Sequence, residues 1–164
     1  MSLFFLEPEV AGNLGENTTY ANLTAIRERR ERPIVQHLHY ECDVWLGNEL
    51  LTATPCFIVT ELLAADLLAS DLSGVVFEDL EISTSEEYED RHKFRPDMPQ
   101  LPSFRRLIPA GKVVLDEATL TVSEWSGHDI CVSVSDALVV TDRALEVLKR
   151  HALAYCDVHP LNMP

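Results

Sequence analysis

One phrase of this chain occurs twice, and the repetition limits the folds that the chain can adopt. FIVTELLAADLL (57–68) and LVVTDRALEVLK (138–149) align at a constant spacing of 81 residues. In each copy an apolar, β-branched run ends at a threonine, Thr60 or Thr141, and an acidic residue follows. Threonine is a favourable N-cap, and an acid in the first turn interacts well with the helix dipole. Each copy therefore predicts a strand that leads into a capped helix.

The residues that follow extend each copy to a strand–helix–strand unit. Apolar residues recur at helical spacing after each threonine, and alternating segments follow at VVFEDLEI (75–82) and AYCDVHP (154–160). Such alternation is typical of half-buried strands. We expect Gly74 to supply the left-handed residue that ends the first helix. In the second helix we expect cations in the last turn, where the dipole favours them: Lys149, Arg150 and His151.

The chain length fits one domain that covers residues 1–164, and 46% of the residues are apolar, which is ordinary for a packed protein. The pattern has too many strands for a doubly wound fold, so we predict an α+β fold. Its mixed or antiparallel sheet or sheets are covered by two main helices. The repeat divides the domain into pseudo-repeat halves, about 34–82 and 113–160. Either an internal duplication or the general physics of capped helices between strands explains it.

An acidic, proline-rich segment, residues 83–104, lies between the two halves. Its prolines, Pro96, Pro99 and Pro102, predict a long loop or linker. Clustered carboxylates interleaved with aromatic residues suit an interface with a basic protein, although a charge run of this kind is also typical of a solvated surface. The candidate partner-binding residues are Glu86, Glu87, Tyr88, Glu89, Asp90 and Phe94.

The charge balance excludes some classes of partner. With 27 acidic and 13 basic residues the net charge is −14, so binding to nucleic acid or to an anionic membrane is disfavoured. A strong negative field suits a basic partner protein. The start of the chain, MSLFFLEPEV, has a short apolar run and no basic residue, which predicts a first strand at 3–6 and a cytoplasmic protein without a signal peptide. The four cysteines lack C-x-x-C spacing and are expected to be reduced and mostly buried.

The strongest enzyme-like pattern lies in IVQHLHYECDVWL (34–46), which alternates like a half-buried strand. On such a strand His37, His39, Glu41 and Asp43 share one face, and metal sites use such ligands. A solvent-facing strand that carries histidines gives the same pattern. The sequence has no nucleophile elbow, P-loop or dinucleotide fingerprint. We therefore assign no catalytic, cofactor-binding or metal-binding residue.

Several stretches together resemble immunity family eleven of bacterial polymorphic toxin systems. They are EPEVAGNLGENT, LHYECDVWLGNELL with TPCFIVTELL, SGVVFEDLEISTSEEYE and DALVVTDRALEVLKRHAL, which span nearly the whole chain. The resemblance implies a protein that neutralises a cognate toxin by binding it, here a toxin with a basic surface, and implies no catalytic residue. Two alternatives stay open. One is a small metal- or thiol-dependent enzyme built on the histidine face, and the other is a structural or oligomerisation module whose apolar strand edges pair two copies.

Overall fold

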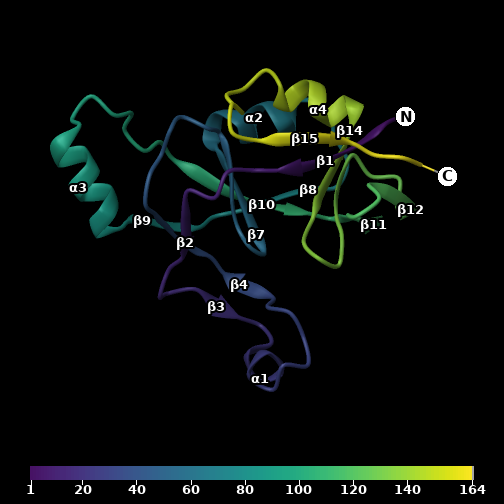
Figure 1. Cartoon of the computed structure of the whole chain (residues 1–164), viewed down its shortest axis with the longest axis horizontal. Helices are drawn as coiled ribbons and strands as arrows, with labels where there is room; N and C mark the ends of the chain where they lie inside the picture. The colour runs from purple at the N-terminus through teal and green to yellow at the C-terminus, as the bar shows by residue number, and fades with distance from the viewer. Residues whose placement is uncertain (164) are drawn as a thin grey trace.

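The computed structural model describes residues 1–163 and has the predicted mixed α+β class, in which strands (39%) outweigh helices (18%). Figure 1 shows the main sheets beneath two neighbouring helices, with two projections: a helix at one end and an arm below. The largest sheet has six strands in the order β12 (Thr121–Trp125), β11 (Gly111–Asp116), β13 (Ile130–Val132), β14 (Leu138–Thr141), β1 (Leu3–Glu7) and β15 (Asp157–Pro160).

The other strands form three smaller sheets. A four-stranded sheet has the order β6 (Leu50–Ala53), β7 (Cys56–Thr60), β10 (Phe104–Pro109) and β8 (Val75–Glu78). A three-stranded sheet contains β2 (Gly12–Leu14), β5 (His39–Cys42) and β9 (Glu81–Thr84), and β3 (Thr19–Tyr20) pairs with β4 (Val35–His37). The helices are α1 (Leu23–Arg27), α2 (Glu61–Ala69), α3 (Glu86–Phe94) and α4 (Asp142–Leu148).

The two copies of the repeated phrase have the same topology. In the first copy β7, α2 and β8 follow one another, and β10 lies between the two strands, antiparallel to both. In the second copy β14, α4 and β15 follow one another, and β1 occupies the same central place. The two copies also add equivalent outer strands, because β6 pairs antiparallel with β7 and β13 with β14.

The strand registers match residue by residue. Thr60 pairs with Phe104, and Thr141, which lies 81 residues after Thr60, pairs with Leu3. On the other side of the central strands, Leu107 pairs with Phe77 and Leu6 pairs with Val158, again 81 residues after Phe77. Each central strand thus comes from the other half of the chain. β1 precedes the first repeated unit but pairs with strands of the second, and β10 precedes the second unit but pairs with strands of the first.

The main core lies between the two larger sheets and the pair of helices α2 and α4. It includes buried residues of both halves, for example Leu63 and Leu67 from α2 and Leu145 and Leu148 from α4. Burying side chains of this size stabilises the fold by roughly 1.5–3 kcal/mol each, an upper estimate. Because α2 and α4 contribute to the same core, neither half has a complete core of its own.

Both predicted helix caps are confirmed. Thr60 Oγ1 accepts a hydrogen bond from the amide of Leu63 at 3.2 Å, and Thr141 Oγ1 accepts one from the amide of Ala144 at 3.3 Å. The predicted helix ends are wrong. Gly74 has the expected left-handed backbone (φ 79°), but α2 already ends at Ala69, and the left-handed residue nearest its end is Asp71 (φ 52°). Helix α4 ends at Leu148, so its three cations follow the helix.

Several expected segments are shorter or more regular in the structure. The predicted strand at 34–46 breaks at Leu38, and the one at 75–82 divides into β8 and β9, which join different sheets. The predicted loop 83–104 is wrong in its first part, where Ser85 caps α3 by accepting a hydrogen bond from the amide of Tyr88 at 3.2 Å. The prolines lie beyond the end of this helix. Since α3 is as long as α2, the expectation of two main helices leaves out a third.

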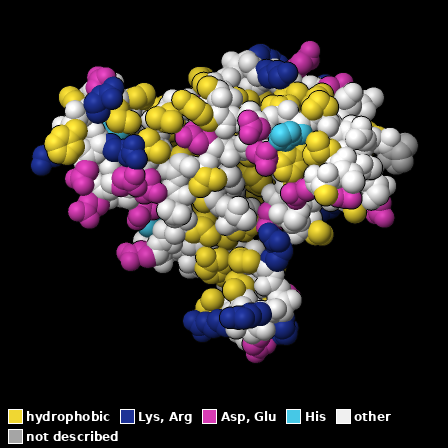
Figure 2. Space-filling view, in the orientation of Figure 1, with side chains coloured by type: hydrophobic (Ala, Val, Ile, Leu, Met, Phe, Trp, Pro, Cys, Tyr) yellow, Lys and Arg dark blue, Asp and Glu magenta, His cyan; other side chains and the backbone are white. Residues whose placement is uncertain are grey.

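The segment 19–37 forms the projecting arm. β3, α1 and β4 extend below the sheets (Figure 1). Arginine side chains lie exposed at the tip, which is visible in Figure 2 as a band of Lys and Arg colour. Two of them are paired: Arg30 with Glu28 and Arg32 with Asp136, each at 2.6 Å.

Candidate partner-binding site

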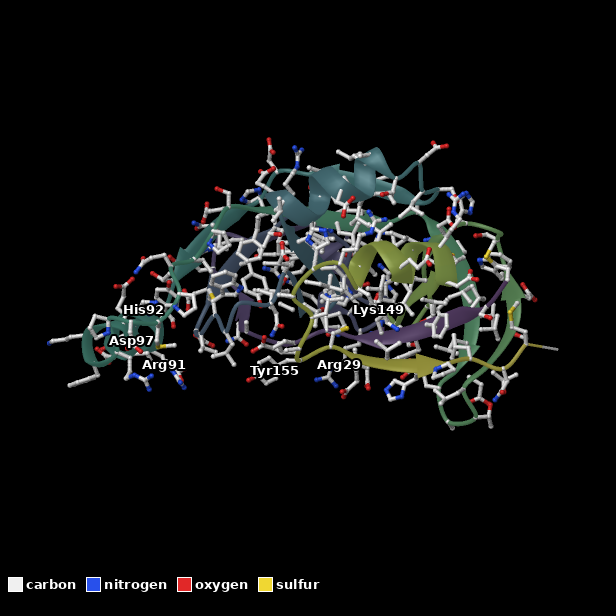
Figure 3. The ribbon with its side chains drawn as sticks, turned by 90° about the horizontal axis from the view of Figure 1, so that it is seen from above. Arg29, Arg91, His92, Asp97, Lys149 and Tyr155 are labelled. Carbon is white, nitrogen blue, oxygen red and sulfur yellow. The ribbon has the colours of Figure 1, made fainter. Side chains whose placement is uncertain are left out.

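Helix α3, at one end of the molecule, carries all six predicted partner-binding residues, and five of them are exposed. Its residues Arg91 and His92 and the following Asp97 are labelled in Figure 3, which shows α3 well apart from α2 and α4. Acids occupy its first turn, and cations occupy its last turn, so its charges complement the helix dipole. Arg91 also pairs with Glu87 at 2.7 Å.

Tyr88 differs from the other predicted residues because it anchors the helix. Its side chain is only 6% exposed and belongs to the same core cluster as Tyr40. Its ring stacks on that of His92 with centroids 4.0 Å apart, and His92 Nδ1 lies 3.0 Å from the Tyr88 carbonyl oxygen. Burial raises the pKa of the Tyr88 hydroxyl. The prediction that Tyr88 contacts a partner does not fit its place beneath the helix.

The outer side of α3 borders a hollow of about 760 Å³. Four predicted residues line it: Glu86, Glu87, Asp90 and Phe94. Phe94 is the most exposed large aromatic side chain in the described part of the chain, at 78%. The fifth, Glu89, turns toward β9, where Thr84 Oγ1 donates a hydrogen bond to its carboxylate at 2.6 Å. The surface thus combines an exposed aromatic ring with three carboxylates and two guanidinium groups, of which Arg91 pairs with Glu87.

Sequence reasoning missed the other residues of this hollow. Leu46, Arg91, Arg95 and Met98 complete its lining. The helical spacing of Glu87, Arg91 and Phe94 would have placed them on one face, but only if the segment had been recognised as a helix. Ser85 followed by acids was the available signal, because Ser is a preferred N-cap. The contribution of Leu46 comes from a distant loop, so no local pattern indicates it.

The histidine face, on which the alternative of a metal-dependent enzyme rests, does not form a metal site in the described part of the chain. His37 lies on β4 and is exposed, whereas His39 starts β5 and is only 4% exposed. Asp43 accepts a hydrogen bond from Asn13 Nδ2 at 3.2 Å. Within residues 1–163 no group of three His, Cys, Asp or Glu side chains is placed to hold a metal ion. The strand break at Leu38 is the reason, since it ends the alternation on which the prediction rests.

His39 instead contacts β9 and the turn that contains Gly15. Its Nε2 is hydrogen-bonded to Ser83 Oγ at 2.7 Å, its Nδ1 accepts a hydrogen bond from the Asn17 amide at 3.2 Å, and Glu81 Oε2 lies 3.2 Å from the same Nδ1. In a Ser–His–acid relay this nitrogen donates to the acid, whereas here it accepts from a backbone amide. The ring is buried beneath the turn that contains Gly15, and an added Cβ at Gly15 would lie 2.2 Å from His39 Nδ1. Because the imidazole is covered, its contacts hold β5, β9 and this turn together.

The cysteines do not form an activated nucleophile. Cys42, Cys56 and Cys131 are buried. Burial raises the thiol pKa to about 11 for Cys42, Cys56 and Cys156. The pKa of Cys131 is also raised by burial. Thiols of this kind are protonated at neutral pH, and the thiolate is the reactive form.

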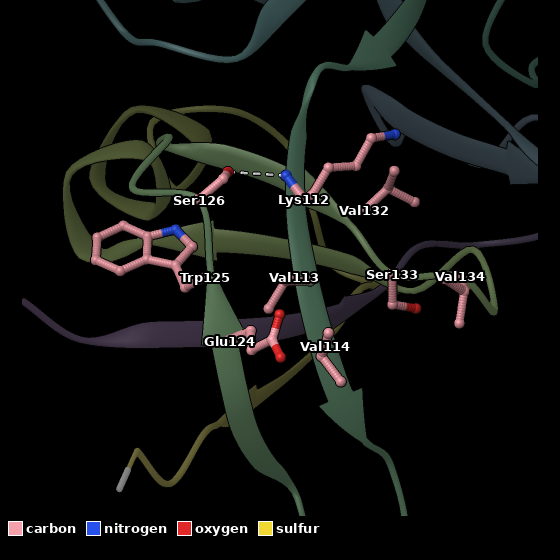
Figure 4. Close-up of a pocket in the computed structure, with 9 residues that line it drawn as sticks. All are labelled: Lys112, Val113, Val114, Glu124, Trp125, Ser126, Val132, Ser133 and Val134. Atoms are coloured by element: carbon pink, nitrogen blue, oxygen red, sulfur yellow. Dashed lines mark hydrogen bonds between the residues drawn. The ribbon is translucent and has the colours of Figure 1, made fainter.

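A second hollow, of about 450 Å³, lies where β11 and β13 diverge (Figure 4). Val113, Val114, Trp125 and Val134 contribute apolar lining, and Trp125 Nε1 donates to the His128 carbonyl oxygen at 2.9 Å. The dashed line in Figure 4 is the hydrogen bond from the Lys112 amide to Ser126 Oγ at 2.9 Å. The lining is mainly apolar, and its charged side chains are those of Lys112 and Glu124, which suits contact more than acid–base chemistry.

Comparisons with known proteins give no relative from which a role could be transferred. No protein-family model matches the chain, and comparison with the curated proteins finds no match. None of the helices in residues 1–163 combines the length and the apolar character of a membrane span.

Proposed function

We propose that this protein binds a partner protein through the outer face of α3, and that the partner is a cognate bacterial toxin with a basic surface. The observation that carries the proposal is the exposed ring of Phe94 beside the carboxylates of Glu86, Glu87 and Asp90 around one hollow. The identity of the partner rests on the resemblance of the sequence to immunity proteins. On this proposal the protein acts in the cytoplasm, where it would block its toxin.

The two kinds of side chain contribute differently to such binding. An aromatic anchor that becomes desolvated in a partner pocket typically supplies 2 kcal/mol or more, on the order of a hot-spot residue. The carboxylates attract a basic surface over distance and raise the association rate, an effect that salt screens. The hollow beside Phe94, with Leu46 and Met98 in its lining, offers room for a partner side chain in return.

The position of α3 supports a role in binding more than in folding. It lies between the two repeated units, and its exposed face contributes nothing to the main core. Tyr88 is buried and attaches the helix to the core, so the exposed residues of α3 are not needed for that attachment. Exposed apolar side chains beside a hollow are typical of interaction sites.

The test begins with the tagged protein as bait in its native host, with the captured partner identified by mass spectrometry. Binding of the purified partner is then measured for the wild type, for Phe94→Ala, and for the double variant Glu86→Lys with Glu87→Lys. We expect the Phe94 variant to dissociate faster and the charge variant to associate more slowly, with a weaker dependence on salt.

The matched control is Val134→Ala, which shortens an apolar side chain that is 88% exposed on a different surface. This variant is expected to bind like the wild type. If the Phe94 and charge variants also bind like the wild type, α3 is not the contact surface. If the captured partner has no toxin activity, the toxin part of the proposal is wrong.

A second candidate function, hydrolysis by Ser83, is favoured only by the hydrogen bond between Ser83 and His39 and by the nearby carboxylate of Glu81. Both Ser83 and Glu81 project from one strand, and the imidazole is covered, so a substrate has little access to the pair. Covalent labelling of Ser83 by a fluorophosphonate probe, absent in His39→Ala, would favour this function. We expect no labelling.

A further inference from the structure

Helix α2 exposes an apolar face that the fold does not require. Leu62 and Leu68 are 69% and 62% exposed, and Ala65 and Ala69 are exposed beside them. The inner residues Leu63, Ala64 and Leu67 fill the core, so the helix is apolar on both sides. Isolated exposed leucines are common on protein surfaces, whereas a continuous apolar stripe indicates a contact.

The second copy provides an internal control for this observation. Matching positions in α2 and α4 share nearly the same burial pattern, since they follow the same register. At every exposed position of the stripe, however, the second copy has a charged residue, in α4 or directly after it, and one of these, Lys149, is labelled in Figure 3. The matched pairs are Leu62 and Arg143, Ala65 and Glu146, Leu68 and Lys149, and Ala69 and Arg150. The fold therefore accommodates charged residues at these positions, so folding does not explain why α2 has apolar residues there.

The stripe is symmetric about Ala65. Leu62 and Leu68 lie three residues before and after it, and the small side chain of Ala65 lets another backbone approach closely. When two such helices cross antiparallel at Ala65, Leu62 of each helix meets Leu68 of the other. A surface of this kind is self-complementary, as a twofold interface requires.

The two ends of the stripe also fit each other. At its N-terminal end Leu62 borders a hollow of about 420 Å³ with Trp45 and Pro102 in its lining. At its C-terminal end Leu68 projects from the surface. A twofold axis through Ala65 brings the projecting leucine of each copy toward the hollow of the other. Each copy thus supplies both the projection and the space that receives it.

The charges at the ends of the helix agree with this arrangement. Arg143 lies at the C-terminal end of α2, where its Nη2 donates a hydrogen bond to the Asp71 carbonyl oxygen at 2.8 Å. The exposed acid Glu61 lies at the N-terminal end. The antiparallel crossing brings Glu61 of one copy toward Arg143 of the other, whose Nη2 also pairs with Asp129 of its own chain at 3.2 Å.

We propose that a second copy of this chain covers the apolar stripe of α2, so that the protein forms a twofold dimer. The interface is small, and two chains of net charge −14 repel each other. The dimer is therefore weak at low salt and becomes stronger as salt screens the repulsion. This response is opposite in sign to that of the toxin complex through α3, so the two proposals can fail independently.

The experiment is sedimentation velocity of the full chain over a range of concentrations, in about 50 mM and about 1 M salt. We expect a monomer–dimer equilibrium that shifts toward dimer at high salt. Leu68→Lys, which installs the residue type found at the matching position of α4, is expected to raise the dimer Kd by about tenfold or more. Val134→Lys, on an exposed residue outside the stripe, is expected to leave it unchanged.

Disulfide cross-linking tests independently whether the twofold axis passes near Ala65. Under oxidising conditions Ala65→Cys is expected to give a disulfide-linked dimer, whereas Ala118→Cys, at an exposed position away from α2, is not. The thermal midpoints of all variants are compared with that of the wild type to confirm folding. A wild type that remains monomeric at high salt overturns the proposal, as does a dimer that Leu68→Lys does not weaken. Either result would mean that a second copy of this chain does not cover the stripe.

Discussion

Glu49 and Asp129 occupy equivalent places in the two copies, and each carboxylate accepts a hydrogen bond from the threonine that caps the following helix. The distances are 2.6 Å from Thr60 Oγ1 to Glu49 and 2.8 Å from Thr141 Oγ1 to Asp129. Each acid also accepts a backbone amide hydrogen bond from the other half: Glu49 from Ala152 and Asp129 from Ser73. These two acids therefore connect each helix start to the segment that follows the opposite helix.

The cap in the second copy is expected to contribute to stability. Thr141→Ala removes the side-chain acceptor of the Ala144 amide and the donor to the buried Asp129, so the free energy of unfolding should fall by about 1–2 kcal/mol. Urea denaturation measures this change. Thr119→Ala, at an exposed site outside the helices, is the control and should differ from the wild type by less than about 0.5 kcal/mol. Equal stability of both variants would contradict the role of the cap.

Stability should decrease in acid because of the same two carboxylates. Burial opposes the charged form of Glu49, but hydrogen bonds from Thr60 and Ala152 and the charge of His151 outweigh it, and the pKa falls below its usual 4.5. For Asp129 burial is likewise outweighed, by bonds from Ser73 and Thr141, and the pKa falls below 3.8.

A lowered folded-state pKa means that the stabilisation is present above the unfolded-state pKa and is lost as pH falls through the folded-state value. The wild type should therefore lose stability progressively below about pH 4.5. In Asp129→Asn the thermal midpoint is expected to be lower at neutral pH and to change less on acidification. If the midpoint of this variant falls with pH as steeply as that of the wild type, Asp129 does not contribute to the acid transition.

Gly15 is expected to be intolerant of even one added carbon. A Cβ there would lie 2.2 Å from Nδ1 of His39, whose ring is fixed by Ser83 and Glu81. Gly15→Ala should thus cost about 1–3 kcal/mol, as overpacking does. In the double variant with His39→Ala the ring is gone, so the added methyl should cost less than in the single variant. A double-mutant cycle in urea measures this coupling, and additive effects would show that the two residues do not press on each other.

The four thiols are expected to react slowly in the folded protein. Burial raises their pKa values, to about 11 for Cys42, Cys56 and Cys156, so little thiolate exists at pH 8. Titration with an aromatic disulfide reagent should therefore be slow without denaturant and should count four thiols rapidly in denaturant. One thiol that reacts rapidly in the native protein would identify an activated cysteine and would favour a thiol-dependent enzyme.

The sequence by itself determined the features that depend on neighbouring residues. Thr60 and Thr141 cap their helices because the bond that each makes reaches only three residues along the chain. A short apolar run likewise indicated β1, and the alternation of apolar residues indicated β15. The helix over 86–94 could have been inferred from Ser85 and its acids, but the downstream prolines outweighed that signal in the prediction.

The tertiary structure alone decided which strands pair and which side chains meet. Nothing local indicates that β1 lies between β14 and β15, or that β10 lies between β7 and β8, because these pairings join distant parts of the chain. The meeting of His39 with Glu81 follows from the parallel pairing of β5 and β9. The exposed stripe of α2 became evident only once burial separated its two apolar faces. Hydrophobic pattern fixes the period of an element, whereas packing fixes which of its apolar residues face the core.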